Sequence, residues 1–304
     1  MRDRFACPKG VSGRVDKILA DHYQDFSRGF IKLSIEEGRI TYADGSSIVP
    51  KSKIYPGDEL LVSLERPKTE ELEPYNYDLT VLYEDNHILV IDKEAGMVVH
   101  PGDGTDDKTL VHALLHHCGS NLSSIGAPLR PGIVHRLDKE TSGVMVVAKS
   151  ELAHLSLAEQ FSSRKTGKIY QAIVCRKLEG FGEFTQPISR HPTVRVKMTV
   201  SEKGKAAWTK WRSLKNFGKQ FSHIECEIMT GRTHQIRVHL SAAGHPLAGD
   251  KTYGYKAVKG QDCISRVMLH ASKLSIEHPE TLQKMEFTSP LPWDFQECLN
   301  RLEQ

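Results

Sequence analysis

A proline-containing, charged segment, residues 66–78 (RPKTEELEPYNYD), most constrains how this 304-residue chain can fold. It contains few aliphatic side chains, which is typical of a linker between folded units. Domains commonly have about 100 to 200 residues, so the chain has room for one large core and one small accessory module. We therefore expect a small domain over residues 12–65, a linker over 66–78 and a large domain over 79–304.

The small block has the patterns of two short helices followed by short strands. Val15, Ile18, Leu19 and Tyr23 recur at helical spacing, and a second helix is predicted from an N-cap at Ser27 to a stop at Gly38. Strands are predicted at three places, separated by the turns Asp44-Gly45 and Pro56-Gly57-Asp58: residues 39–42, 48–49 and 59–64.

The large block mixes strand and helix patterns. Two helices are predicted, one over residues 150–164 with Ser150 as N-cap and one over 233–243 ending at Gly244. Apolar strand patterns occur at residues 79–83, 87–92, 144–148, 169–174 and 223–228. This mixture predicts an α+β fold with a mixed, largely antiparallel sheet.

Cysteine usage and hydropathy limit the class of protein. The six cysteines are spread along the chain without a CxxC pair, so we expect neither disulfides nor a zinc site. His116 and His117 beside Cys118 lack a second cluster that would complete a metal site. No apolar run approaches the roughly 20 residues of a membrane span, and no apolar segment follows the N-terminal charges, so we expect a soluble, cytoplasmic protein.

Charge is distributed unevenly along the chain. Residues 1–127 contain 14 Lys and Arg against 21 Asp and Glu, whereas residues 128–304 contain 27 against 17. Residues 190–219 contain nine basic side chains and one acid, Glu202. Such a run fits either a solvated strand-and-loop region or a surface that contacts a polyanion such as RNA. Within it, the candidate phosphate contacts are Arg195, Lys197, Lys205 and Lys210.

The small block resembles the S4 RNA-binding domain. The similar stretches are RVDKIL, SRGFIKLSIEEGRITYADG and IYPGDELL, within residues 12–65. The resemblance implies that its paired helices present basic side chains to structured RNA. The positions that would do so are Arg14, Lys17, Arg28, Lys32 and Arg39. The helical acids Asp16, Asp21, Asp25, Glu36 and Glu37 equal these bases in number and so reduce the expected affinity of this module.

The most informative segment of the large block is Arg130–Lys149 (RPGIVHRLDKETSGVMVVAK). An apolar strand leads into HRLD, and a Thr-Ser-Gly turn leads into a second apolar strand, so Asp138 lies at a strand–loop junction where a sheet can position it. Spacing alone leaves two interpretations open. Asp138 either caps the turn or pairs with Arg136 as a structural residue, or it is a catalytic carboxylate.

HRLDKETSG resembles the signature of the RluA-type family of pseudouridine synthases, and of its RluD-like members, which also have an N-terminal S4 domain. Further similar blocks follow in order: DKEAGMVVHPG, KIYQAIV, GRTHQIRVHLSAAGHPLAGDKTYG, LHASKLSIEHP and SPLP. The resemblance extends over most of residues 79–296. It implies the pseudouridine synthase fold and the isomerisation of uridines in structured RNA, with base flipping and without a cofactor.

The same resemblance implies roles for individual residues. Asp138 matches the catalytic aspartate, and Arg237 matches the arginine that pairs with it and favours its ionised form. Tyr170 matches the tyrosine that stacks on the base, and Ile236 the apolar residue that packs on the uracil. Arg136 matches the residue that keeps the target nucleotide out of its helix.

Two other functions remain as alternatives. The large domain of a pure RNA-binding protein would lack Asp138, Tyr170 or Arg237, whereas all three are present. A hydrolase of small substrates would need neither the S4-like block nor the basic run. We therefore expect an RNA-modifying enzyme that is a monomer and acts on large-subunit ribosomal RNA or else on transfer RNA.

Overall fold

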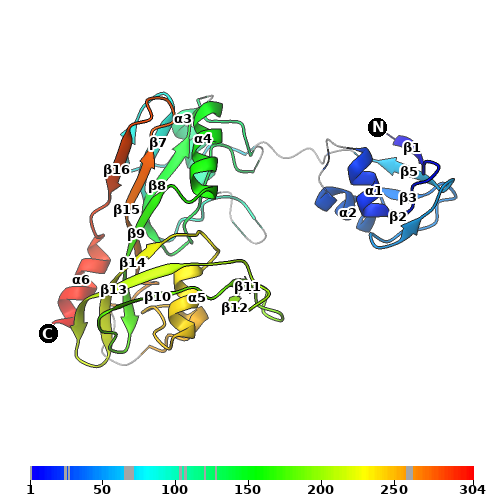
Figure 1. Ribbon diagram of the computed structural model, residues 1–304. Helices are drawn as coiled ribbons and strands as arrows, with labels where there is room; N and C mark the ends of the chain where they lie inside the picture. Colours follow the sequence, from blue (N-terminus) through cyan, green and yellow to red (C-terminus); the bar gives the residue numbers. More distant parts are fainter. Residues whose placement is uncertain are drawn as a thin grey trace. The chain divides into compact units, whose positions relative to one another are not determined.

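The computed structural model describes residues 2–23, 26, 28–64, 72–102, 105, 108–119, 121–126, 129–257 and 263–304. Its residues group into two compact units, Met1–Glu70 and Glu71–Gln304. Figure 1 shows the helices and strands of both units.

The first unit packs two helices against short strands. A three-stranded antiparallel sheet has the order β1 (Arg2–Ala6), β5 (Glu59–Ser63), β3 (Ile40–Tyr42), and β2 (Gly13–Arg14) pairs with β4 (Lys53–Ile54). The helices are α1 (Val15–His22) and α2 (Arg28–Glu36). Their apolar faces supply Val15, Leu19, Ile31 and Ile35 to one buried cluster, as their spacing predicts.

The predicted strand at residues 48–49 is wrong. Ile48 is buried in the core of the first unit, but its segment has no strand pairing, and only the neighbouring Ser47 forms an isolated bridge with Thr41. An apolar residue can enter the core from a loop, so a short apolar pair does not define a strand. Gly38 ends the second helix with a φ of 71°, as predicted, whereas the predicted N-cap Ser27 lies outside the described residues.

Part of the predicted linker lies within the second unit. The backbone N–H of Tyr75 donates to the carbonyl of His112 at 2.9 Å, and the hydroxyl of Tyr77 donates to Glu94 at 2.7 Å. The described residues 72–78 have no helix or strand.

The second unit is built on a nine-stranded sheet. The strand order is β10-β13-β14-β9-β15-β8-β7-β6, with β16 paired to β15. All pairs are antiparallel except β15 with β8, which is parallel. The strands are β6 (Val81–Glu84), β7 (Ile88–Lys93), β8 (Ser142–Ala148), β9 (Gly167–Cys175), β10 (Phe181–Phe184), β13 (Thr209–Phe217), β14 (Phe221–Ile228), β15 (Leu269–Glu277) and β16 (Lys284–Thr288). The α+β class with a mixed, largely antiparallel sheet is thus confirmed.

Helices cover both faces of this sheet. Successive side chains of a strand point to opposite faces, and in β7 Leu89 and Ile91 pack in the cluster that includes α3 (Leu110–Cys118), whereas Ile88 and Val90 pack in the cluster that includes α4 (Glu151–Ser162). Near the other end of the sheet, α5 (Gln235–Ala242) joins the first of these clusters, and α6 (Trp293–Leu302) packs in a further one (Figure 1).

Both predicted helices of the second unit are present, although α4 ends at Ser162, before the predicted Arg164, which has a left-handed backbone. Ser150 accepts the backbone N–H of Ala153 at the start of α4, as an N-cap does. The predicted helix over 233–243 begins later, at Gln235, because His234 has a left-handed backbone. The hairpin of β11 (Ile188–Arg190) and β12 (Met198–Val200) lies within the predicted basic region and packs in a small cluster with Val238 of α5.

Among the helices that the structure describes, none has the length and apolar character needed to cross a membrane.

Candidate active site

Asp138 lies in a tight turn just before β8. The backbone N–H of Thr141 donates to the carbonyl of Asp138 at 3.1 Å, which closes the turn, and the side chain of Asp138 is 18% exposed. The carboxylate is therefore positioned by rigid backbone yet remains accessible.

Two buried cations fix the backbone of this turn. The ammonium of Lys93 donates to the carbonyls of Glu94, Met97 and Lys139 at 2.7, 3.0 and 3.3 Å. Burial lowers the pKa of Lys93 to about 7, with the negative charge of Asp138 opposing that shift. The guanidinium of Arg266 donates to the carbonyl of Glu140 at 3.1 Å. Both residues bind backbone atoms next to Asp138, so they restrict where its carboxylate can lie.

Two glycines permit close backbone contacts beside the turn. A Cβ on Gly143 would lie 2.2 Å from the carbonyl oxygen of Ala271, where β8 meets β15. A Cβ on Gly249 would lie 1.7 Å from the carbonyl oxygen of Arg266, and this residue has a φ of 83°. Only glycine fits such positions without displacing backbone. Gly249 directly precedes Asp250, so this contact places the second acid of the site.

Arg237 joins the two acids. Its Nη1 donates to Oδ2 of Asp138 at 3.1 Å, while Nε and Nη2 donate to the two carboxylate oxygens of Asp250 at 2.7 and 3.0 Å. Asp250 is 1% exposed. The pKa of Arg237 is raised because the hydrogen bonds and charges of both acids outweigh its burial. The bidentate pair fixes the plane of the guanidinium, so Nη1 is directed at Asp138.

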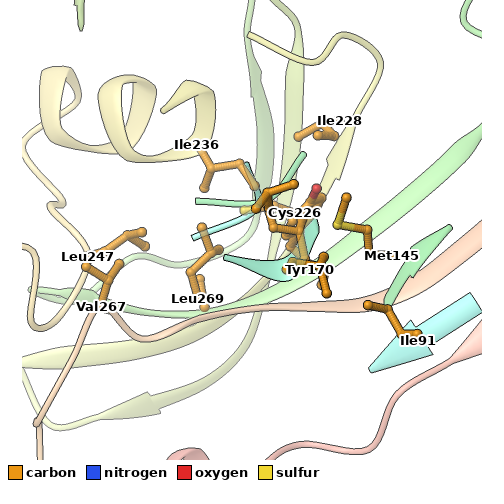
Figure 2. Close-up of a cluster of buried hydrophobic side chains, with 14 of the residues drawn as sticks. Ile91, Met145, Tyr170, Cys226, Ile228, Ile236, Leu247, Val267 and Leu269 are labelled. Carbon is orange, nitrogen blue, oxygen red and sulfur yellow. The ribbon is translucent and has the colours of Figure 1, made fainter. Parts of the chain in front are cut away.

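Tyr170 and Ile236 form an apolar wall beside these charges. Tyr170 on β9 is 8% exposed and Ile236 on α5 is 4% exposed, and Figure 2 shows the two side chains in one cluster with Cys226 and Leu269. Burial, and secondly the charge of Asp138, raises the pKa of Tyr170, so its phenol stays protonated. A protonated phenol and an aliphatic side chain suit the flat face of a neutral heterocycle.

One pocket of about 490 Å³ contains all five predicted site residues. Asp138, Arg136, Tyr170, Ile236 and Arg237 all line it, and this volume lies in the range usual for small ligands. The exposed Arg136 donates from Nη1 to Nε2 of His100 at 3.0 Å.

His135 and Lys168 also line the pocket and are partly desolvated. The His135 ring stacks on Phe161 at 4.4 Å, and its Nε2 accepts the backbone N–H of Val146 at 3.0 Å. Burial lowers the pKa of His135 to about 3 and that of Lys168 to about 8. His135 is thus a neutral acceptor that fixes the loop, whereas Lys168 supplies a positive charge to the pocket lining.

The predicted RNA-binding residues have different surroundings. In the first unit, Arg14 and Arg28 both bind the buried Asp16, at 2.8 and 3.1 Å, and Lys32 pairs with Glu36, whereas Lys17 is exposed. The two arginines therefore have a structural partner, which weakens their prediction as RNA contacts.

In the second unit, the basic run divides into two parts. Lys210 in β13 faces Glu227 at 3.9 Å and lies over the ring of Trp208, and its neighbour Arg212 pairs with Glu225. By contrast, Arg195, Lys197 and Lys205 form no ion pair with any residue in the described part of the chain. The hairpin and the loop after it thus offer more free positive charge than β13.

The sequence reasoning missed several residues of this site. The sequence alone gives no role in this site to Lys93, His234, Asp250 or Tyr253. Asp250, His234 and Tyr253 all fall in the block GRTHQIRVHLSAAGHPLAGDKTYG, which was the available signal. Within the described ranges there is no group of three or more His, Cys, Asp or Glu side chains that could hold a metal ion.

Comparisons with known proteins identify the family of this chain. Residues 87–242 match the family described as RNA pseudouridylate synthase. An RNA pseudouridine synthase of Aquifex aeolicus is 41% identical, over 97% of this chain and 96% of the relative. The ribosomal large subunit pseudouridine synthase D of Pseudomonas aeruginosa is 41% identical, over 96% of this chain and 92% of the relative.

A solved structure extends the similarity to the fold. Human RNA pseudouridylate synthase domain containing 1 aligns with a TM-score of 0.58 and 28% identity, over 77% of this chain and 90% of that protein. The family match spans the turn of Asp138, Tyr170 and Arg237, and the relatives align over nearly the whole chain. This chain therefore belongs to the RNA pseudouridylate synthase family and is an RNA pseudouridine synthase.

Proposed function

We propose that this enzyme isomerises uridines in large-subunit ribosomal RNA, with Asp138 as the catalytic carboxylate. The observation that best supports the proposal is the chain Asp250–Arg237–Asp138, which directs one guanidinium N–H at a partly exposed carboxylate in a pocket. A cation with directed donors favours the ionised carboxylate, which the reaction requires at its start.

The proposed reaction rearranges one nucleotide and needs no second substrate. The bond from the sugar to N1 of uracil breaks, the base turns, a bond from the sugar to carbon 5 forms, and the proton of carbon 5 is lost while N1 gains one. The reaction involves no net oxidation or reduction and transfers no phosphate group, so no cofactor is required. Asp138 would act either as a nucleophile or as the base that takes a sugar proton, and both steps need a pocket that retains the free base.

The pocket lining fits a uridine that has left its stack. Tyr170 would stack on the base and Ile236 would pack on it, which supplies apolar contact on a neutral ring. Arg136 would lie between the extruded nucleotide and the rest of the RNA, because an enzyme that acts on a base must remove it from the helix. His100 would orient Arg136 through the bond of 3.0 Å.

RNA would be bound outside the pocket by the basic side chains of the β11–β12 hairpin that form no ion pair with described residues, and by the first unit. We propose residues 12–65 as an S4-like RNA-binding domain, 66–78 as the linker and 79–304 as the catalytic domain. Ribosomal RNA is favoured over transfer RNA because several relatives are named ribosomal large subunit pseudouridine synthase D. An enzyme of ribosomal RNA would act in the cytoplasm.

Replacing Asp138 tests the proposal. Asp138→Asn should abolish tritium release from Pseudomonas aeruginosa large-subunit ribosomal RNA transcribed with carbon-5-tritiated uridine, while RNA affinity changes by less than about tenfold, since the carboxylate acts on bond breaking rather than on phosphates. The matched control is Glu140→Gln, two residues further along the same turn, which should keep wild-type release. Undiminished release by Asp138→Asn would disprove the role of Asp138.

A further inference from the structure

His234 has an unusual backbone next to the candidate carboxylate. Its φ of 56° and ψ of 23° lie in the left-handed region, directly before α5. Histidine adopts this region more often than most residues, but at a cost in free energy that the surroundings must offset. The conformation places Nε2 of His234 3.9 Å from Oδ1 of Asp138. Arg237 binds the other oxygen, Oδ2, of the same carboxylate.

The hydroxyl of Tyr253 contacts one ring nitrogen of His234. This hydroxyl accepts the backbone N–H of Met198 at 2.8 Å and lies 2.8 Å from Nδ1 of His234. Since the N–H of Met198 occupies one acceptor position, the hydroxyl proton is available for Nδ1. Burial raises the pKa of Tyr253 and lowers that of His234, so the first is a neutral donor and the second a neutral imidazole. When the hydroxyl donates to Nδ1, the neutral ring has its proton on Nε2, the nitrogen that lies 3.9 Å from Oδ1 of Asp138.

The ring of Tyr253 also contacts Arg237. The guanidinium carbon lies 5.0 Å from the centre of the Tyr253 ring, and the rings of Tyr253 and His234 meet edge to face at 5.6 Å. One side chain therefore contacts both donors that face Asp138. Tyr253 follows Asp250 by three residues and donates its backbone N–H to that carboxylate, so the acid and the phenol are fixed by the same turn.

We propose that His234 and Tyr253 are positioning residues for the catalytic carboxylate. Tyr253 holds the imidazole of His234 in the tautomer whose Nε2–H faces Oδ1 of Asp138, opposite Arg237 on Oδ2. The two donors then define the orientation of the carboxylate toward the nucleotide. The inference rests on the proposed function, in which Asp138 performs the chemistry. Residues that orient metal ligands typically change activity by about 10- to 100-fold when replaced, and we expect an effect of this size for residues that orient a catalytic carboxylate.

Tyr253→Phe tests the inference, because it removes the hydroxyl and leaves the ring beside Arg237. With the same tritiated ribosomal RNA, kcat should fall at least about tenfold while KM changes by less than about twofold, since no RNA contact is removed. The matched control is Tyr83→Phe on β6, at the far edge of the sheet, whose hydroxyl donates to Asp85 at 2.9 Å. It should leave both constants unchanged.

A second variant shows whether Tyr253 acts through His234. Asparagine tolerates the left-handed backbone, so His234→Asn removes the ring without adding strain, and it should lower kcat as Tyr253→Phe does. The double variant should be no slower than His234→Asn alone, because the hydroxyl has then lost its target. Thermal unfolding of each variant shows whether it folds. If Tyr253→Phe does not fold, the kcat of His234→Asn alone tests the inference.

The outcomes separate this inference from the proposed function. Wild-type kcat in Tyr253→Phe or in His234→Asn, or additive losses in the double variant, would overturn the inference while the wild-type enzyme still releases tritium. A rise in KM at unchanged kcat would also overturn it, because the pair would then bind RNA. A wild-type enzyme that releases no tritium would overturn the proposed function first and this inference with it.

Discussion

At the scale of single residues, the pair of Arg237 and Asp250 is the most buried ionic contact of the site. The side chains are 10% and 1% exposed. Removing one partner of a buried pair leaves an uncompensated charge, which typically costs about 3 to 5 kcal/mol. Asp250→Asn should therefore lower the free energy of unfolding by about 3 kcal/mol, measured by urea unfolding. Glu297→Gln, which removes the partner of Arg301 on the outside of α6, should change it by less than about 0.5 kcal/mol. Equal losses in the two variants would contradict this account.

The residues of the site could be predicted only in part. The family resemblance named Asp138, Tyr170, Arg237, Ile236 and Arg136, which line one pocket, although their roles remain predictions. Asp250 and Tyr253 gave no local signal, because their partners are distant or depend on a turn: Asp250 binds Arg237 across 13 residues, and Arg237 binds Asp138 across 99. His234 fitted a helical pattern, but its contact with Tyr253 is a tertiary effect that periodicity does not contain.

At the scale of elements, the β11–β12 hairpin is the part of the basic run best placed to contact phosphates. Arg195 and Lys197 lie in its loop, without ion pairs to described residues. Each phosphate contact releases counterions, so Arg195→Ala and Lys197→Ala should each reduce the slope of log affinity against log salt by about 1. Fluorescence anisotropy with a labelled ribosomal RNA fragment, between about 50 and 200 mM salt, measures this slope.

The matched control for the hairpin is a basic residue of the same run whose side chain is already paired with an acidic residue of this protein. Arg212 in β13 donates to Glu225 of β14 at 2.7 Å, so Arg212→Ala should change the slope little. A larger effect of Arg212→Ala than of Arg195→Ala would place the RNA on β13 instead. The sequence could not divide the run in this way, because the acids that pair with Lys210 and Arg212 belong to β14 and face β13 only in the observed register.

At the scale of the whole molecule, the three tryptophans report on one unit only. Trp208, Trp211 and Trp293 all belong to Glu71–Gln304, so tryptophan fluorescence follows the unfolding of that unit alone. A core as small as that of Met1–Glu70 supplies only a few kcal/mol, and the larger unit buries a greater share of its surface. We expect calorimetry to show two transitions on heating, with the smaller at lower temperature and without a change in tryptophan emission. A single transition seen at the same temperature by both methods would mean that the two units unfold together, and the segment after Glu70 would then transmit stability between them instead of only connecting them.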